Sequence, residues 1–109
     1  MKPVKEKIVA SSSGSLFVGA LALHADDNVA TALRALAVGE TIRVGGCDRD
    51  LQIEMQQAVP LCHKFALVLI PVGEAVTKYG ESIGKASRNI ASGEHVHVHN
   101  LISERALHR

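Results

Sequence analysis

The chain is a series of short apolar and alternating stretches, and this pattern predicts a mainly β domain of short strands. LFVGALAL (16–23) and KFALVLI (64–70) are apolar almost throughout, as strands buried on both faces are. TIRV (41–44) and the first part of LQIEMQQAV (51–59) alternate apolar and polar residues, which is typical of half-buried strands. The remaining expected strands lie in EAVTKYG (74–80), IGKAS (83–87) and HVHVHN (95–100).

The stretch HADDNVATALRALAVGE is the exception, because its pattern predicts one short helix of about ten residues. Its apolar residues Val29, Leu33 and Leu36 recur at i, i+4 and i+7, which places them on one helical stripe. Asp26 or Asp27 can cap this helix, since a short acidic side chain accepts hydrogen bonds from the free N–H groups of the first turn.

A Gly-Glu pair recurs between apolar positions in LAVGETI (36–42), IPVGEAV (70–76) and IASGEHV (90–96). Glycine followed by a polar residue is suited to a turn that bends the chain into a new strand. Gly73 and Gly93 are therefore assigned structural roles. The irregular spacing of the three copies excludes a solenoid.

The length of 109 residues predicts one compact domain that buries roughly two-thirds of its unfolded surface. We expect a flexible tail over residues 1–14, the domain over 15–103 and a second tail over 104–109. The basic start and later apolar run resemble a signal peptide only faintly. An apolar run of eight residues is too short to cross a membrane, so a cytoplasmic location is predicted.

Composition excludes several functional classes. The net charge is +1, aromatic residues make up 3% and Trp is absent, which argues against nucleic-acid binding. Cys47 and Cys62 form no disulfide framework and lack metal-ligand spacing, so they are predicted to be free thiols. No nucleophile elbow, phosphate loop or HExxH motif is present, and a standalone enzyme is not expected.

Three histidines alternate in GEHVHVHN (93–100) and provide the main candidate chemistry. On a strand, His95, His97 and His99 share one face, while the intervening valines pack on the other. Neighbours on that face are about 6.6 Å apart, so two rings can converge on one metal ion. The outer two are about 13 Å apart on a straight strand, which limits a metal site to two of the three.

Further metal ligands would come from His63 or His24, with Glu94 orienting a ring. The alternative is a solvated strand face without a ligand. His63 and Lys64 precede an apolar stretch, and Lys78 and Tyr79 precede a turn; these side chains can bind a carboxylate or hydroxyls. The alternative for Lys78 and Tyr79 is an ordinary surface lysine and a half-buried packing residue.

Four motifs in order, DNVA, HKFA, IPVGEAVTKYG and GEHVHVHN, resemble the small SAF domain of the altronate and galactarate dehydratases. They also resemble the separate small subunit of sulfolactate sulfo-lyase. The resemblance extends over residues 22–101 and implies a β-clip fold of short bent strands, which agrees with the mainly β prediction with one short helix. Cys62 stands where the family usually has Gly, so the resemblance leaves the turn before His63 open.

The resemblance implies a small subunit or detached N-terminal domain of a hydro-lyase of hexuronate catabolism that removes water from a sugar acid. A separate large catalytic chain would carry most of the machinery, with Fe2+ or Mn2+ in the assembled enzyme and no metal certain in this chain alone. Without that chain we expect no activity. The alternatives are a sulfolactate sulfo-lyase small subunit, which expels sulfite, and a free-standing small-molecule binding module; self-association into a homo-oligomer stays open.

The resemblance also assigns residues, although none is assigned as catalytic. The substrate-binding positions are His63, Lys64, Lys78, Tyr79, His95, His97 and His99. The candidate metal ligands are His97 and His99. The structural positions are Asp27, Asn28, Gly73, Gly80, Gly93 and Glu94.

Overall fold

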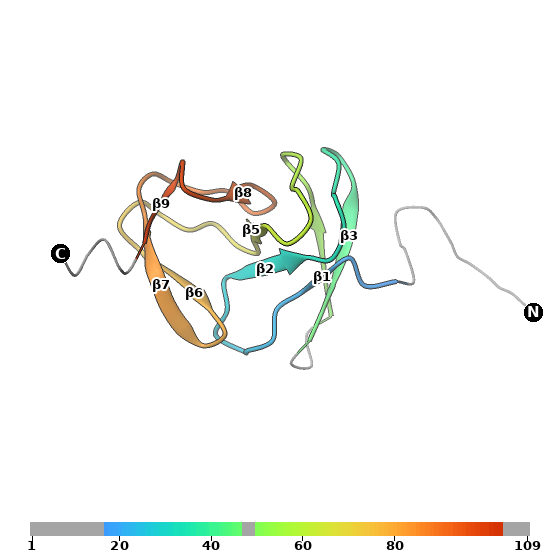
Figure 1. Ribbon diagram of the computed structural model, residues 1–109, viewed down its shortest axis with the longest axis horizontal. Helices are drawn as coiled ribbons and strands as arrows, with labels where there is room; N and C mark the ends of the chain where they lie inside the picture. The colour runs from blue at the N-terminus through green and yellow to red at the C-terminus, as the bar shows by residue number, and fades with distance from the viewer. Residues whose placement is uncertain (1–16, 47–49, 104–109) are drawn as a thin grey trace, which may run out of the picture.

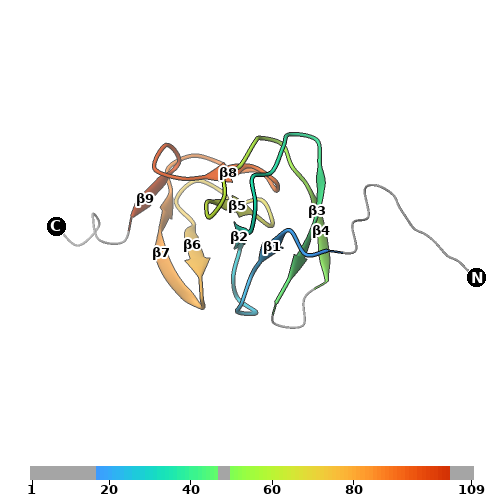
Figure 2. The ribbon, with the colours of Figure 1, turned by 45° about the vertical axis from the view of Figure 1, so that its right-hand side comes forward.

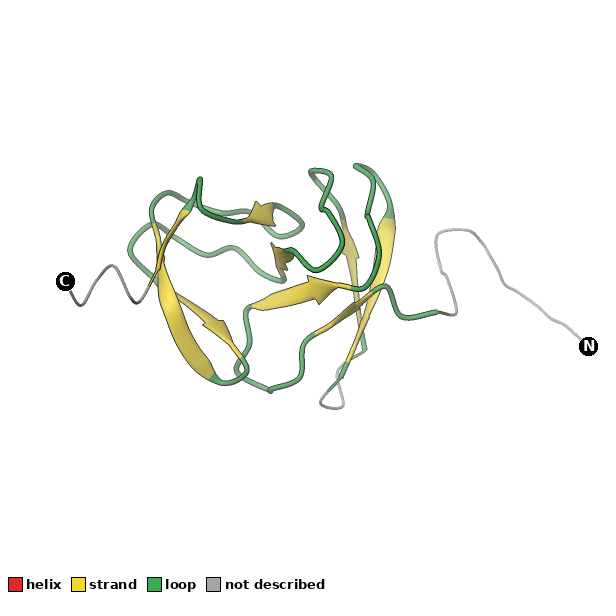
Figure 3. Ribbon diagram, viewed as in Figure 1, coloured by secondary structure: helices red, strands yellow, loops and turns green. Residues whose placement is uncertain are grey.

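The computed structural model describes residues 17–46 and 50–103, and within these ranges the protein consists of strands and turns without a helix (Figure 3). The two predicted tails (1–14 and 104–109) and Cys47 lie outside the described residues. The strands are β1 (Ala20–Leu21), β2 (Val29–Ala32), β3 (Thr41–Gly45), β4 (Leu51–Glu54), β5 (Lys64–Ala66), β6 (Ala75–Lys78), β7 (Glu81–Ala86), β8 (His95–Val96) and β9 (Leu101–Ser103).

These strands form two sheets. The larger has the order β4-β3-β1-β2-β5-β8 and the smaller has the order β6-β7-β9. Only β1 and β3 pair in parallel, and the other described pairs are antiparallel. In Figures 1 and 2 the small sheet lies at one side of the molecule and β3–β4 at the other, with β2, β5 and β8 between them.

Two clusters of small and medium aliphatic side chains form the core, as the shortage of aromatic residues requires. Phe65 of β5 is fully buried in the first cluster, and Ala66 beside it belongs to the second. Alternate positions of β5 therefore face different clusters. β5 therefore contributes side chains to both core clusters.

Four β-turns share one geometry, and they confirm the three Gly-Glu turns predicted from the repeat. In each, the carbonyl of the first residue accepts the N–H of the fourth, over residues 37–40, 60–63, 71–74 and 91–94. The third residue has a φ between 70° and 88°, the left-handed region that glycine tolerates best. That residue is glycine in three turns and Cys62 in the fourth. The turn before His63 therefore keeps the same geometry without a glycine.

The turns are also related through the residue that precedes each of them. Leu36 pairs with Val59, and Ile70 pairs with Ile90, in isolated antiparallel bridges. All four of these side chains are buried. One bridge therefore joins the turns over 37–40 and 60–63, and the other joins the turns over 71–74 and 91–94.

The prediction of a helix after residue 24 is wrong, and the segment forms β2 instead. β2 pairs with β1 on one side and β5 on the other, so its backbone groups are satisfied by long-range partners. Val29 and Leu36 belong to different core clusters, and Leu33 is exposed. Tertiary pairing has outweighed a local apolar period of 3.6.

Several predicted strands are shorter than their apolar patterns. The first strand is confined to Ala20–Leu21, and Phe17 is exposed. β5 ends at Ala66, and Val68 beyond it is exposed, so KFALVLI is not an interior strand throughout. β9 has no counterpart in the prediction.

The histidine segment also departs from the prediction, because its strand ends after two residues. β8 contains only His95 and Val96, and residues 97–100 form a turn. Val96 is buried as expected, but Val98 is 82% exposed and does not pack on a second face.

A histidine and lysine site at the sheet edge

Pairing of β5 with β8 brings His63 to the alternating histidines. Phe65 pairs with His95 and Lys64 with Val96, in antiparallel register. Continuing that register by one residue places His63 opposite His97. The rings of His63 and His97 accordingly stack, with their centroids 4.4 Å apart. β8 is the edge strand of the large sheet, so the cluster lies at an edge.

Three of these rings form a compact group. His63 Nδ1 and His95 Nε2 lie 2.9 Å apart and share a hydrogen bond. One nitrogen from each of His63, His95 and His97 lies within 4.8 Å of the other two. All three side chains are partly buried. We call these three residues the histidine triad.

His99 reaches the edge of the triad because the chain turns after β8. Its ring centroid is 5.4 Å from that of His95, with the planes tilted by 47°. The expectation of a 13 Å separation assumed a straight strand, and the turn over residues 97–100 removes that separation. His99 is exposed.

Asn100 holds this turn and was not singled out from the sequence. Its side chain is fully buried, its Nδ2 donates to the His95 carbonyl at 2.8 Å, and its Oδ1 accepts the His97 N–H at 3.0 Å. Gln57 adds a further bond by accepting the His95 N–H at 3.0 Å. The position of Asn100 directly after the last histidine of GEHVHVHN is the signal that could have identified it.

Two rings of the triad, His95 and His97, have pKa values that are lowered and so favour the neutral form. Burial lowers the pKa of His95, and the charges of His63 and the other neighbouring basic groups lower it further. Desolvation also lowers the pKa of His97, with His63 and Lys64 as further causes. At neutral pH these rings therefore carry free nitrogen lone pairs.

Lys64 provides a partly buried positive charge beside the triad. Burial lowers the pKa of Lys64, and the charge of Lys78 lowers it further. No salt bridge joins either lysine to a carboxylate in the part of the chain that the structure describes. Lys78 Nζ instead lies 4.9 Å from the ring centre of Tyr79. Lys64 and Lys78 therefore present positive charge that an acidic ligand can neutralise.

Asp27 and Asn28 hold the two sheets together, where a helix cap was expected. Asp27 is buried, and its carboxylate accepts the N–H groups of Gly80 and His24, at 2.9 and 3.3 Å. The Asn28 side chain accepts the N–H of Thr77 and donates to the carbonyl of residue 75. Asp27 therefore caps no helix, and both side chains bind backbone groups of the small sheet and its β6–β7 turn.

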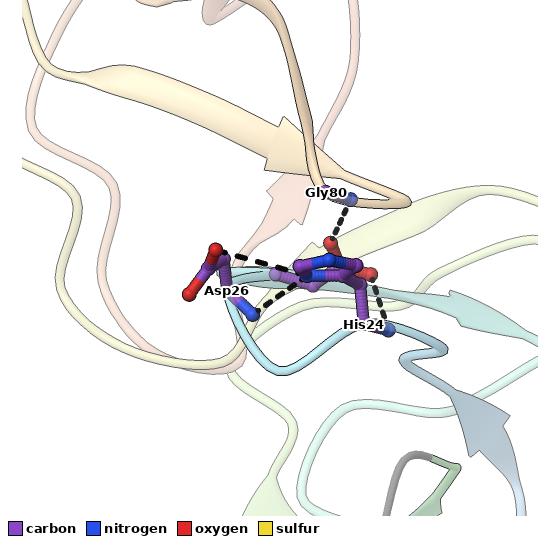
Figure 4. Close-up of polar contacts among 4 residues, drawn as sticks. His24, Asp26 and Gly80 are labelled. Carbon is purple, nitrogen blue, oxygen red and sulfur yellow. Dashed lines mark hydrogen bonds and ion pairs between the residues drawn. The ribbon is translucent and has the colours of Figure 1, made fainter.

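Figure 4 shows His24 in this junction, with its ring lying against the Gly80 backbone and beside Asp26. A Cβ at Gly80 would come within 2.7 Å of the His24 ring. His24 Nδ1 accepts the N–H of Asp26 at 3.1 Å. His24 is therefore occupied at the junction, whereas the histidine triad lies at the β5–β8 edge.

Glu94 contacts the backbone and does not orient a ring. Its Oε1 accepts the N–H of Ala91 at 2.6 Å, which closes the turn before β8. Glu40 makes the same bond to Ala37 at 2.7 Å in the first turn. Glu94 thus stabilises the turn that leads into His95.

No helix in the described ranges is long and apolar enough to span a membrane.

The fold and the site together define an all-β domain with a histidine and lysine cluster at one sheet edge. The family model of the altronate/galactarate dehydratase SAF domain matches residues 18–104. The chain therefore belongs to this family of SAF domains.

Curated relatives extend the comparison. The altronate dehydratase of Escherichia coli (strain K12) is 46% identical over 78 residues, and that of Bacillus subtilis (strain 168) is 41% identical over 78 residues. Each alignment covers 72% of this chain but only 15% of the dehydratase. The (2R)-sulfolactate sulfo-lyase subunit alpha of Chromohalobacter salexigens is 45% identical over 58 residues, which cover 53% of this chain and 62% of the relative.

Proposed function

We propose that this domain supplies part of the active site of a sugar-acid dehydratase and acts together with a large catalytic chain. The observation that carries the proposal is the histidine triad beside Lys64, a charge without an acidic partner in the described residues. Membership of the SAF family and similarity to two altronate dehydratases support this choice of reaction.

In this proposal the lysines bind the acid group of the substrate. Lys64 and Lys78 are close enough for the charge of one to lower the pKa of the other. A carboxylate placed between them would relieve that repulsion and accept charge-assisted hydrogen bonds. Tyr79, in contact with Lys78, is positioned to bind a substrate hydroxyl.

The histidines act on the hydroxyl groups or on a metal ion. Dehydration removes a proton next to the carboxylate and expels a β-hydroxyl, which must be protonated to leave as water. A neutral imidazole of His97 or His95 can accept or relay such a proton, and His99 borders the same space. A divalent ion, Fe2+ or Mn2+, would polarise the carboxylate in the assembled enzyme.

A sulfolactate sulfo-lyase subunit is the second candidate. The chain aligns with 62% of the alpha subunit of the Chromohalobacter enzyme, against 15% of the altronate dehydratases. The same lysine and histidine groups would then bind sulfolactate, and the leaving group would be sulfite. A free-standing binding module for small acids is the remaining alternative.

The test is to purify the protein from cells that make it and to assay the assembly with altronate, galactarate and (2R)-sulfolactate. Formation of a 2-keto-3-deoxy acid supports the dehydratase, and release of sulfite supports the sulfo-lyase. Recovery of the chain without a large catalytic partner, and without either activity, would contradict both and favour the binding module.

Variants then test the site in the active assembly. His97→Ala should lower kcat/KM at least about 100-fold, the scale of positioned acid–base catalysis, whereas the control His24→Asn should stay near wild type. Lys64→Gln should raise KM about 10-fold or more, because a charged hydrogen bond contributes about 1.5–3 kcal/mol. Its control is Lys85→Gln, an exposed lysine of β7. Full activity of His97→Ala would remove the triad from the active site.

A further inference from the structure

We propose that His63, His95 and His97 form a three-histidine metal site that this chain holds by itself, with an open fourth position for an acidic ligand. The site differs from the His97 and His99 pair expected from the sequence, since it includes His95 and also His63, the residue directly before β5. The inference goes beyond the proposed function, because it requires neither a catalytic partner nor a substrate.

The geometry of the triad is close to that of a tetrahedral centre. One nitrogen from each ring lies within 4.8 Å of the other two. At metal–nitrogen distances of about 2.0–2.1 Å, the nitrogens of a tetrahedral site are about 3.3 Å apart. The rings would have to rotate to bring the three nitrogens to this separation. The 2.9 Å contact between His63 Nδ1 and His95 Nε2 already joins two nitrogens at less than that separation.

The hydrogen bond between His63 and His95 shows that His63 Nδ1 and His95 Nε2 face each other. One ring must donate its N–H and the other must accept with an unprotonated nitrogen. A metal ion that displaces the single shared proton would accept a lone pair from each of the two nitrogens. His97, stacked on His63 at 4.4 Å, provides the third imidazole on the same side.

The backbone that carries the triad is fixed before any ion binds. His95 and His97 are held by the buried Asn100, and His95 also by Gln57. His63 ends the hydrogen-bonded turn over residues 60–63, directly before β5, which pairs with β8. Ligands held by paired strands and their adjoining turns reduce the ordering that binding requires.

The donor set selects the class of ion. Three imidazoles without a carboxylate suit Zn2+, Co2+, Ni2+ or Fe2+, whereas Mn2+ and Mg2+ prefer oxygen ligands. Three protein ligands also leave one tetrahedral position open, as catalytic sites do. The positive charge of nearby Lys64 disfavours a bare cation and favours an acidic group as the fourth ligand.

The test uses the full chain without a polyhistidine tag, stripped of metal, and titrated with Zn2+ by calorimetry and with Co2+ by visible absorption. We expect one ion per chain and the intense d–d bands of tetrahedral Co2+. His63→Ala, His95→Ala and His97→Ala should each weaken binding about 100-fold or more, beyond the range seen for outer-shell changes. His24→Asn should bind as the wild type does.

His99→Ala distinguishes the triad from the His97 and His99 pair. The triad predicts a change of less than about 10-fold, below the range of about 10- to 100-fold for outer-shell changes. An effect as large as that of His63→Ala would overturn the proposal. So would absence of Co2+ bands, or equal Zn2+ affinity in the wild type and His63→Ala.

Circular dichroism and the unfolding midpoint of each variant show whether it folds, and His95→Gln replaces His95→Ala if the latter does not. Because metal alone is used, loss of metal binding would leave the dehydratase proposal standing. Conversely, failure to recover a catalytic partner or either activity would contradict both candidate enzymes and leave a metal site in this chain standing.

Discussion

At the scale of single residues, the unusual position is Cys62. It has a φ of 70° where the three related turns have glycine, and a side chain in this region costs about 1–2 kcal/mol. The residue after it, His63, belongs to the histidine triad. A strained turn thus directly precedes a side chain of the candidate site, an arrangement that is common at binding sites.

Replacing Cys62 by glycine should stabilise the protein by about 0.5–1 kcal/mol, since relief of the left-handed strain outweighs the added freedom of the unfolded chain. Cys62 is exposed, so its side chain contributes little packing. Urea denaturation measures the change. Cys62→Ala retains the strain and should stay within about 0.3 kcal/mol of wild type. An equal gain from alanine and glycine would show that φ is not the cause.

Lys64 should reduce stability at neutral pH, because it is partly buried without an acidic partner in the described residues. Its pKa is lowered on folding, so the unfolded chain binds more protons between the folded and unfolded pKa values. The free energy of unfolding should therefore rise with pH through that window, up to the unfolded value near 10.5. Lys64→Met should be more stable than the wild type at pH 7.

The measurement is urea denaturation of the wild type and Lys64→Met from pH 7 to pH 10.5. The gap between them should narrow as the pH rises. Lys85→Met, at an exposed position of β7, serves as the control and should show no such trend. A constant gap would indicate an effect of packing and not of charge.

At the scale of elements, the four turns share a geometry but not their surroundings. Gly73 has open space where a Cβ would be, whereas a Cβ at Gly93 would overlap the Glu54 carbonyl. Gly93 also donates its N–H to Ala66 of β5. The turn before β8 is therefore packed against two strands, which fixes the start of the histidine segment.

This difference predicts unequal effects of the same substitution. Gly73→Ala should cost about 1–2 kcal/mol, the strain of the left-handed conformation alone. Gly93→Ala adds a backbone clash and should cost more than about 3 kcal/mol, or prevent folding. Thermal and urea denaturation of both variants provide the comparison. Equal losses would show that the Glu54 contact is not restrictive.

How much of this could be predicted depends on the range of each interaction. The Gly-Glu turns and the alternation of β3 are local, and both were predicted from residues a few positions apart. The helix prediction failed because β2 is specified by its pairing with β1 and β5, which a local period does not reveal. The geometry of the fourth turn was left open because Cys62 stands in place of glycine.

The candidate site shows the same division between local patterns, which the sequence reveals, and long-range pairing, which it does not reveal. The alternating histidines are visible in the sequence, but the proximity of His63 and His97 depends on the β5–β8 register. The turn that brings His99 to the triad depends on Asn100, whose burial follows only from the complete fold. Sequence patterns thus identified the side chains, and long-range pairing decided which of them meet.

At the scale of the whole molecule, two sheets are joined by polar side chains at the start of β2. Asn28 bonds to both the N–H of Thr77 and the carbonyl of Ala75, so it acts as an additional partner for β6. Asp27 holds the β6–β7 turn through Gly80. Lys78, at the end of β6, is thereby held in place relative to Lys64 of the large sheet.

Asn28→Asp should loosen the small sheet, because a carboxylate oxygen would replace the amide that donates to Ala75. A lost donor facing a carbonyl costs about 1–3 kcal/mol. Amide hydrogen exchange should increase in β6 and β7 more than in β3 and β4. Asn89→Asp, whose oxygen accepts the N–H of Val72, keeps its acceptor and serves as the control. Uniform acceleration across both sheets would contradict a local junction.

The four related turns have a consequence for how this fold can change. His63 occupies the place in its turn that glutamate occupies in the other three, where Glu40 and Glu94 lock the turn with their carboxylates. One of the four related turns therefore has an imidazole at the position where the other three have a glutamate. Stabilising substitutions can thus be confined to the three Gly-Glu turns, so that the turn before the candidate site stays unchanged.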